Sequence, residues 1–199
     1  MTDKPKVLCF AGSLRKDSHN KKLARLAARL VDEAGGQATF IDLKDFDLPL
    51  YDGDIESESG LPENAKKLKK IMKEHQAFLI ASPEYNSALS AVLKNVIDWT
   101  SRPEPGEKSL EAYTGKVAGL LAASPGAMGG LRGLVGLRSI LGNIGVILIP
   151  DQIAIAQAHE AFDDDGSLKD SKKQETVKRI ASRVVEVAGA LAKPVAVSK

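Results

Sequence analysis

The chain has 199 residues, of which 43% are hydrophobic and 27% are charged, and its formal net charge is +2. This composition is typical of a globular protein that can bury a substantial core. Because the charges are scattered and form no basic stripe, nucleic-acid binding is not expected. The sequence contains neither a long apolar run nor a signal-peptide pattern, which favours a cytoplasmic protein with no membrane segment.

The sequence contains one cysteine, Cys9, within the apolar run of residues 7–11. A single cysteine cannot form an intrachain disulfide, which fits a reducing compartment. No neighbouring residue would lower its pKa, so we interpret Cys9 as a small buried side chain and not as a nucleophile.

The first part of the chain alternates between short apolar runs and helical patterns. Residues 6–11 form an apolar run that ends at Gly12 and predict a buried strand. Residues 20–34 carry apolar side chains at helical spacing, and a Gly-Gly pair ends the predicted helix. Residues 38–42 predict a second strand. Residues 43–60, rich in Asp, Pro and Gly, predict a long irregular segment.

The rest of the chain repeats this alternation. Further strands are predicted at residues 77–82, 116–123 and 146–149. Helices are predicted at residues 62–75, 88–101, 130–143 and 172–192, with a polar loop at 102–113. Alternating strands and helices predict a parallel sheet covered by helices on both faces. Five strands fit a flavodoxin-like three-layer α/β sandwich of order 2-1-3-4-5, and no linker divides residues 1–199 into domains.

The loop after the first predicted strand has the residues of a phosphate-binding loop. In such sheets, ligands bind beyond the carboxyl ends of the strands, here between strands 1 and 3. Ser13, Ser18 and Asn20 offer short hydrogen-bonding side chains, and Arg15 offers a cationic fork. The amides at the start of the next helix favour an anion. The glycine patterns of a Walker loop and of the dinucleotide fingerprint are both missing. The alternative is an ordinary helix cap by Ser18 or Asn20.

The loop after the third predicted strand reads Pro83-Glu84-Tyr85-Asn86-Ser87. Pro83 stiffens the chain where it leaves the strand. Tyr85 offers a flat face to an aromatic ring, and the backbone of residues 84–87 offers hydrogen bonds to ring heteroatoms. The alternative is a capped turn with Ser87 at the start of the next helix.

Three motifs occur in order, the first two at predicted strand ends. They are Gly12-Ser13-Leu14-Arg15 with Ser18 and Asn20, then Pro83-Glu84-Tyr85-Asn86-Ser87, and then Leu93-Lys94-Asn95-Val96-Ile97-Asp98-Trp99. Together they closely resemble the NADPH-dependent FMN reductase family, which includes bacterial chromate and quinone reductases and some azoreductases. The resemblance extends over nearly the whole chain, from Val7 to Leu191.

The resemblance implies a set of cofactor-binding residues. The residues implied to hold the FMN phosphate are Ser13, Arg15, Ser18 and Asn20. The residues implied to frame the isoalloxazine ring are Pro83, Glu84, Tyr85 and Asn86. The loop after the fourth strand is implied to lie at the flavin edge, with the candidates Ser124, Gly126 and Gly129. For this last loop, a glycine hinge before a helix is the alternative.

The resemblance also implies the activity. NADPH or NADH would pass a hydride through bound FMN to a small acceptor, such as a quinone, an azo compound, chromate, a ferric chelate or free flavin, in a ping-pong cycle. No protein acid or base is required, which fits the lack of a His or Cys dyad. One alternative is a flavodoxin-like electron carrier, although such carriers are usually strongly acidic. The other is a non-catalytic module on the same fold.

The resemblance further implies a homodimer or homotetramer. Subunit contacts would come from the helix of residues 93–99 and from the region of Arg132 and Arg138, because arginines are hard to place on a helix that only faces a sheet. Trp99, the only tryptophan, is interpreted as an interface residue in preference to a core residue.

Three other features have weaker signals. Leu50 and Tyr51 follow strand 2 in a long loop at the same sheet end, which makes them substrate-side candidates, with a surface loop as the alternative. His19 is interpreted as a helix-start residue or a polar wall of the phosphate site in preference to a general acid. Residues 163–165 are three aspartates, but they lack the spacing of a calcium loop, so they predict an exposed turn and no metal site.

Overall fold

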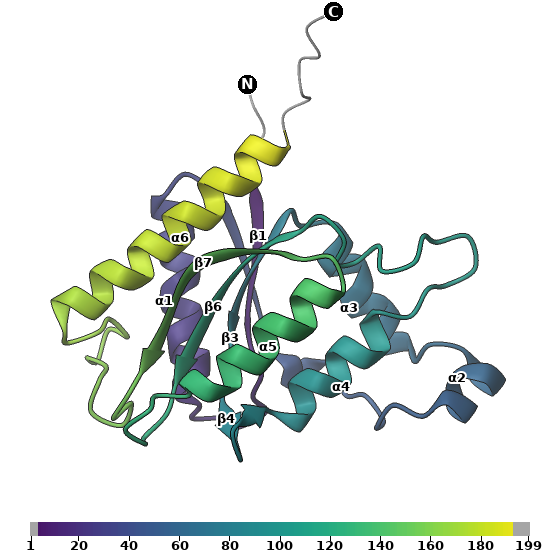
Figure 1. Cartoon of the computed structure of the whole chain (residues 1–199), viewed down its shortest axis with the longest axis horizontal. Helices are drawn as coiled ribbons and strands as arrows, with labels where there is room; N and C mark the ends of the chain where they lie inside the picture. The colour runs from purple at the N-terminus through teal and green to yellow at the C-terminus, as the bar shows by residue number, and fades with distance from the viewer. Residues whose placement is uncertain (1–3, 193–199) are drawn as a thin grey trace, which may run out of the picture.

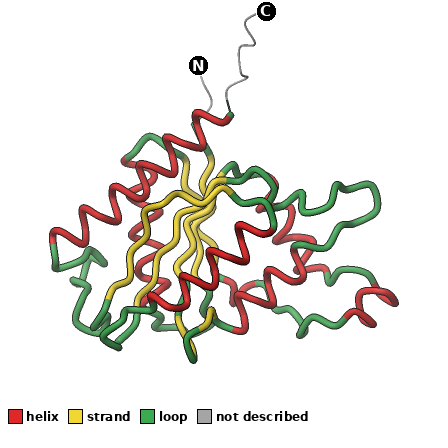
Figure 2. Tube along the Cα trace, viewed as in Figure 1, coloured by secondary structure: helices red, strands yellow, loops and turns green. Residues whose placement is uncertain are grey.

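The computed structural model describes residues 4–192, and its centre is a five-stranded parallel sheet (Figures 1 and 2). The strands are β1 (Lys6–Ala11), β2 (Gln37–Ile41), β3 (Ala77–Ala81), β6 (Val117–Ala123) and β7 (Ile147–Ile155). They lie in the order β2-β1-β3-β6-β7. Counted along the chain, this is the predicted order 2-1-3-4-5, so the flavodoxin-like α/β fold is confirmed.

Helices cover both faces of the sheet and complete three layers (Figure 1). One face carries α1 (His19–Glu33) and α6 (Ser171–Leu191), and the other carries α3 (Glu63–Lys73), α4 (Ala91–Thr100) and α5 (Leu131–Asn143). Successive side chains of a strand point to opposite faces. Val7 and Cys9 therefore belong to the core under α1 and α6, and Leu8 and Phe10 to the core under the other helices. Burial on both sides explains why the strands are continuous apolar runs.

A short hairpin precedes α4, where the sequence predicts helix from residue 88. Strands β4 (Glu84–Tyr85) and β5 (Ala88–Leu89) pair antiparallel across two residues. Those residues, Asn86 and Ser87, have φ angles of 51° and 65°. Positive φ at both central positions is the geometry of a tight hairpin turn. The predicted cap at Ser87 is therefore wrong, and Ser90 caps α4 by accepting a hydrogen bond from the Leu93 amide at 3.2 Å.

Two other segments differ from prediction. The segment predicted as irregular contains a 3-10 helix (Leu43–Asp45) and α2 (Gly53–Ser59), which projects away from the sheet (Figure 1). Strand β7 continues past its predicted end at residue 149 and runs through Pro150 to Ile155. An edge strand accommodates a proline because one of its sides needs no hydrogen bonds.

Trp99 is completely buried within its own chain, so its interpretation as an interface residue is wrong. Its ring packs against Leu61 and Ala65 and meets the edge of the Tyr51 ring at a centroid distance of 4.9 Å. Its Nε1 donates a hydrogen bond to the Pro49 carbonyl at 2.8 Å. Trp99 therefore fixes the segment that follows β2 onto α4.

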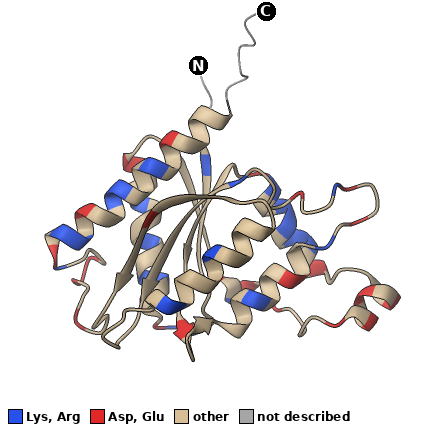
Figure 3. Cartoon of the chain, in the orientation of Figure 1, with Lys and Arg blue, Asp and Glu red and all other residues tan. Residues whose placement is uncertain are grey.

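The charged residues are distributed over the whole fold. Blue and red residues are interspersed along the chain in Figure 3, in agreement with the scattered charges of the sequence. None of the helices within residues 4–192 has both the length and the apolar character needed to cross a bilayer. Cys9 is buried, and its burial raises the pKa of the thiol far above the ordinary value, which makes it a poor nucleophile.

Candidate functional site

A pocket at the carboxyl ends of the strands brings three loops of the chain together. The lining residues after β1 are Ser13, Arg15, Ser18, His19 and Asn20. Those from the end of β3 and of β6 are Pro83, Glu84, Tyr85, Ala123, Ser124 and Pro125. This position is the topological switch point, where the first connections on either side of β1 diverge. Most of the site residues predicted from the sequence meet here. The predicted residues outside this lining are Asn86, Gly126, Gly129, Leu50 and Tyr51.

The loop after β1 presents hydrogen-bond donors around the start of α1. Ser18 caps the helix, and its Oγ accepts a hydrogen bond from the Lys21 amide at 3.4 Å. The Ser13 Oγ accepts one from the Arg15 amide at 3.3 Å. Both hydroxyl groups keep their own hydrogen to donate. Arg15 is exposed and forms no salt bridge within residues 4–192. The loop is therefore rich in donors and holds no acidic side chain toward the pocket.

Asn20 joins the start of α1 to the end of β6. Its Nδ2 donates to the Ala123 carbonyl at 2.8 Å, and its Oδ1 accepts from the Ala123 amide at 2.9 Å. The side chain is 3% exposed. Because the amide is already occupied by the backbone of Ala123, Asn20 holds two of the three loops at a fixed separation.

Glu84 joins the hairpin to α5. Its Oε2 accepts a hydrogen bond from the Gly133 amide at 3.1 Å, and its Oε1 pairs with Arg132 at 2.7 Å. Helix α5 has no side-chain cap of its own, so Glu84 supplies one from another element. Although partial burial raises the pKa of Glu84, the hydrogen bonds from Gly133 and Arg132 bring it below the ordinary value. The carboxylate is thus charged and already bonded, and Arg132 has an intrachain partner.

The Arg138 side chain also has intrachain partners. It donates to the Ile149 carbonyl at 3.0 Å and to Gln152 Oε1 at 3.0 Å, which ties α5 to β7. Neither arginine of α5 therefore requires a partner subunit to explain its position.

The hairpin turn places Tyr85 at the rim of the pocket. The Tyr85 side chain is 55% exposed, and Asn86 lies at the turn beyond it. Pro83 precedes the hairpin and lines the pocket. The flat face of Tyr85 is therefore available to a ligand that extends out of the pocket.

The loop after β6 is fixed by the chain that follows β7. The Ser124 amide donates to the Ile155 carbonyl at 3.0 Å, and the Ala158 amide donates to the Ser124 carbonyl at 3.1 Å. Gly129 has a φ of +63°, and a Cβ there would lie 2.7 Å from the Ala156 nitrogen. The glycine at this position is therefore required by the close approach of the backbone.

His19 lines the pocket with an unusual ring environment. Its Nδ1 is buried and has no hydrogen-bond partner in the part of the chain that the structure describes. Burial lowers the pKa of His19, and the nearby Lys22, Arg15 and His159 lower it further. The sequence gives no signal for this environment, because His159 comes from a distant segment.

The two substrate-side candidates lie beside α4. The Tyr51 hydroxyl donates to Glu56 Oε2 at 2.7 Å, and its amide donates to Asn95 Oδ1 at 2.8 Å. Leu50 is 79% exposed. Tyr51 is therefore held by its own chain, and neither residue lines the pocket.

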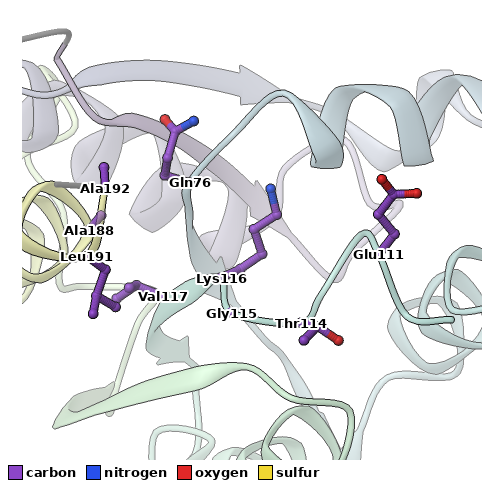
Figure 4. A pocket seen from close by; sticks show the side chains of 9 residues that line it. All are labelled: Gln76, Glu111, Thr114, Gly115, Lys116, Val117, Ala188, Leu191 and Ala192. Carbon is purple, nitrogen blue, oxygen red and sulfur yellow. The ribbon is translucent and has the colours of Figure 1, made fainter. Parts of the chain in front are cut away.

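A second hollow lies at the opposite, amino ends of the strands (Figure 4). It is lined by Gln76 before β3, Lys116 before β6 and Leu191 at the end of α6, among others. The Lys116 Nζ donates to the Lys73 carbonyl at 3.0 Å and caps the end of α3. This hollow faces helix ends that favour cations, whereas the first pocket faces a helix start that favours anions.

Comparisons with known proteins agree with this geometry. The sequence model of the NADPH-dependent FMN reductase family matches residues 5–160. An NAD(P)H-dependent FMN reductase of Pseudomonas aeruginosa is 35% identical over 90% of this chain and 92% of its own length. A quinone reductase of Pseudomonas putida is 34% identical over 89% of this chain and 94% of its own length.

Solved structures share the architecture. The flavoenzyme NAD(P)H:(acceptor) oxidoreductase FerB of Paracoccus denitrificans has a TM-score of 0.79 at 30% identity, over 94% of this chain and 98% of that one. A flavodoxin from the domain Archaea has a TM-score of 0.56 at 12% identity, which shows a shared fold alone. From the family match and these identities, the chain belongs to the NADPH-dependent FMN reductase family and is a flavin oxidoreductase that uses FMN with NAD(P)H as electron donor.

Proposed function

We propose that the pocket holds FMN, with the phosphate in the loop after β1 and the isoalloxazine ring along the β4–β5 hairpin. The observation that carries the proposal is the convergence of Ser13, Arg15 and Ser18 on the start of α1. Hydroxyl donors, a guanidinium and helix amides are the groups that bind a phosphomonoester. The donor set therefore fits the cofactor of the family.

The size of the pocket supports this orientation. Its volume is about 140 Å³, which suits the phosphate end of FMN and leaves the larger ring to extend over the rim. Pro83 and Tyr85 form that rim on the side of the hairpin. The hairpin is fixed to α5 through Glu84, so the residues proposed to frame the ring sit on a braced element. Asn86 would contribute through its backbone at the turn.

The loop after β6 would approach the ring edge. Ser124 lines the pocket, and its Oγ accepts a hydrogen bond from the Gly126 amide at 3.3 Å. Gly129 keeps the loop close to the chain after β7. We assign these residues, together with Asn20, mainly to positioning the loops.

When bound, FMN supplies the redox chemistry by accepting a hydride from NAD(P)H and delivering electrons to an acceptor. The chain would bind and orient the reactants, with the exposed Tyr85 at the rim beside the ring. Donor and acceptor would therefore enter the same space in turn, which is ping-pong turnover. Quinones are the acceptors we favour, with azo compounds, chromate, ferric chelates and free flavin as further candidates. Leu50 and Tyr51 would affect acceptors only from outside the pocket.

We also propose a homodimer or homotetramer. Leu131 and Val135 lie one turn apart on α5 and are 38% and 63% exposed, and Met128 just before them is 52% exposed. Exposed apolar side chains gathered in this way are typical of protein contacts. A cytoplasmic location is supported by the free, buried Cys9.

The absorption spectrum of the purified protein tests the function. We expect a flavin spectrum that bleaches when NADPH is added without oxygen and returns when a quinone is added. A protein whose flavin is bleached only through a separate reductase protein would instead be an electron carrier. Addition of NADH in a parallel sample determines which nicotinamide is preferred.

A further inference from the structure

We propose that His19 recognises the phosphate of the ligand and couples its binding to the uptake of a proton by the imidazole. The inference rests on the proposed function and deepens it, because FMN has a phosphomonoester and riboflavin has none. The evidence is the place of His19 in the pocket, the missing hydrogen bond at its Nδ1 and the charged groups around the ring.

His19 is the first residue of α1 and directly follows Ser18, which caps the helix. It lines the same pocket as Ser13 and Arg15. Helix amides and Arg15 already favour an anion at this place. A ligand phosphate bound by the loop would therefore lie beside the imidazole.

The ring of His19 is not fixed by the folded chain. Its Nδ1 is buried and has no hydrogen-bond partner among residues 4–192. The contrast is His75, whose Nδ1 lies 2.6 Å from the Ile71 carbonyl and whose Nε2 lies 2.8 Å from Thr39 Oγ1. His75 is a structural histidine. Because the χ2 torsion of histidine is broad and no hydrogen bond to Nδ1 opposes it, rotation of the ring would bring Nδ1 toward a ligand in the pocket.

Three basic side chains act on His19, and the one carboxylate in the pocket lining, Glu84, is already bonded to the Gly133 amide and to Arg132. The three basic side chains are Arg15 from the loop, Lys22 from the next turn of α1 and His159 from the chain after β7. His159 has its own acidic neighbour, with Nε2 at 3.4 Å from Glu160. The burial of the ring and the positive charges of Lys22 and Arg15 lower the pKa of His19, which favours its neutral form when no anion is present.

A phosphate dianion reverses the sign of the field at this ring. It neutralises the surrounding cations and accepts a hydrogen bond from the imidazolium, so the pKa of His19 rises on binding. By linkage, the bound state then holds more protons than the free state. Binding of the phosphate is therefore tightest below the pKa of the free ring, and the extra affinity is lost as pH rises through the pKa of the bound ring.

Imidazole titration by NMR tests the coupling without any substitution. The chain has three histidines, and His75 serves as an internal control because both of its nitrogens are bonded. We expect saturating FMN to raise the titration midpoint of His19 and to leave the imidazole resonances of His75 at the same chemical shifts. Riboflavin at saturation should leave the His19 midpoint unchanged. Equal midpoints for His19 with FMN and with riboflavin would overturn the inference.

Binding measurements with the His19→Gln variant give the second readout. Apoprotein is titrated with FMN and with riboflavin between about pH 5 and 8. We expect acidification to strengthen FMN binding by about tenfold more in the unsubstituted protein than in the variant, which corresponds to a pKa rise of about one unit. The titration of the FMN phosphate itself occurs in both proteins and cancels.

The two proposals fail in different ways. If the unsubstituted protein binds FMN and riboflavin equally at every pH, the phosphate assignment of the proposed function is wrong. If it prefers FMN but the variant retains the full pH dependence, only the role of His19 is wrong.

Discussion

Asn20 and Ala123 exchange two hydrogen bonds across the mouth of the sheet, at 2.8 and 2.9 Å. The side-chain amide of Asn20 thereby connects the start of α1 to the end of β6. The relationship separates two kinds of residue in the pocket. Some, such as Arg15, line the pocket and form no salt bridge among the described residues, and others, such as Asn20, hold the loops together.

The Asn20–Ala123 contact should contribute to the stability of the fold. It should also contribute equally to the binding of flavins with and without a phosphate. Asn20→Ala leaves the buried amide and carbonyl of Ala123 unpaired, so we expect a loss of about 1–3 kcal/mol in the free energy of unfolding. Urea denaturation measures this loss, with the exposed Asn143→Ala as the matched control. The variant should bind FMN and riboflavin more weakly by the same factor. A loss of affinity confined to FMN would instead identify Asn20 as a phosphate ligand.

The Glu84 carboxylate should matter more than its ion-pair partner. Glu84→Ala removes the acceptor for the Gly133 amide and the brace of the hairpin, which we expect to cost about 1–2 kcal/mol. Arg132→Ala removes a side chain that is 59% exposed, and exposed pairs contribute only about 0–1 kcal/mol. Thermal and urea unfolding of the two variants compares them directly. Equal destabilisation would show that the ion pair, and not the helix cap, dominates.

Acid stability should depend on Glu107. Although partial burial raises its pKa, hydrogen bonds from Lys69 and Lys73 lower the pKa to about 2, from an ordinary 4.5. The carboxylate therefore stabilises the fold fully above pH 4.5, and this contribution disappears as the pH falls toward about 2.

The test of this linkage is the slope of unfolding free energy against pH. Glu107→Gln should flatten the slope in the acid range. Glu111→Gln is the control, because the Glu111 side chain is 43% exposed and lies 3.8 Å from Lys73. The same slope in all three proteins would rule out Glu107 as the acid-sensitive group.

Steady-state kinetics should show ping-pong turnover. The proposed function has donor and acceptor enter the pocket in turn beside the exposed Tyr85. Double-reciprocal plots against NADPH at several quinone concentrations should give parallel lines, and excess quinone should inhibit competitively against NADPH. Intersecting lines would require donor and acceptor to be bound together, which calls for a second binding space near the flavin.

The sequence predicts the sheet and the meeting of three loops at one of its ends, because both follow from local patterns. Apolar runs such as residues 7–11 identify buried strands, and strand order then places the loops after β1, β3 and β6 together. The roles of Asn20 and Glu84 could not be predicted, because their partners lie 103 and 49 residues away. Only the fold brings those partners within hydrogen-bond distance.

The burial of Trp99 and Lys69 could not be predicted from the sequence either. A helix pattern does not indicate that the segment after β2 covers Trp99, so its burial in its own chain is not apparent from the sequence. Lys69 of α3 is likewise only 2% exposed, and its ammonium group donates to Glu107 and to the Arg102 carbonyl. In both cases the side chain is buried by a long loop, and a loop has no periodicity from which this contact could be predicted.

The central claim is that the loop after β1 holds the phosphate of FMN, and titration of apoprotein with FMN and with riboflavin tests it most directly. For Arg15→Ala we expect FMN binding to weaken by about 1.5–3 kcal/mol, the contribution of a charge-assisted hydrogen bond, with riboflavin binding unchanged. Lys16→Ala, an exposed cation at the next position that does not line the pocket, should leave both affinities unchanged. Equal losses for FMN and riboflavin in Arg15→Ala would contradict the claim.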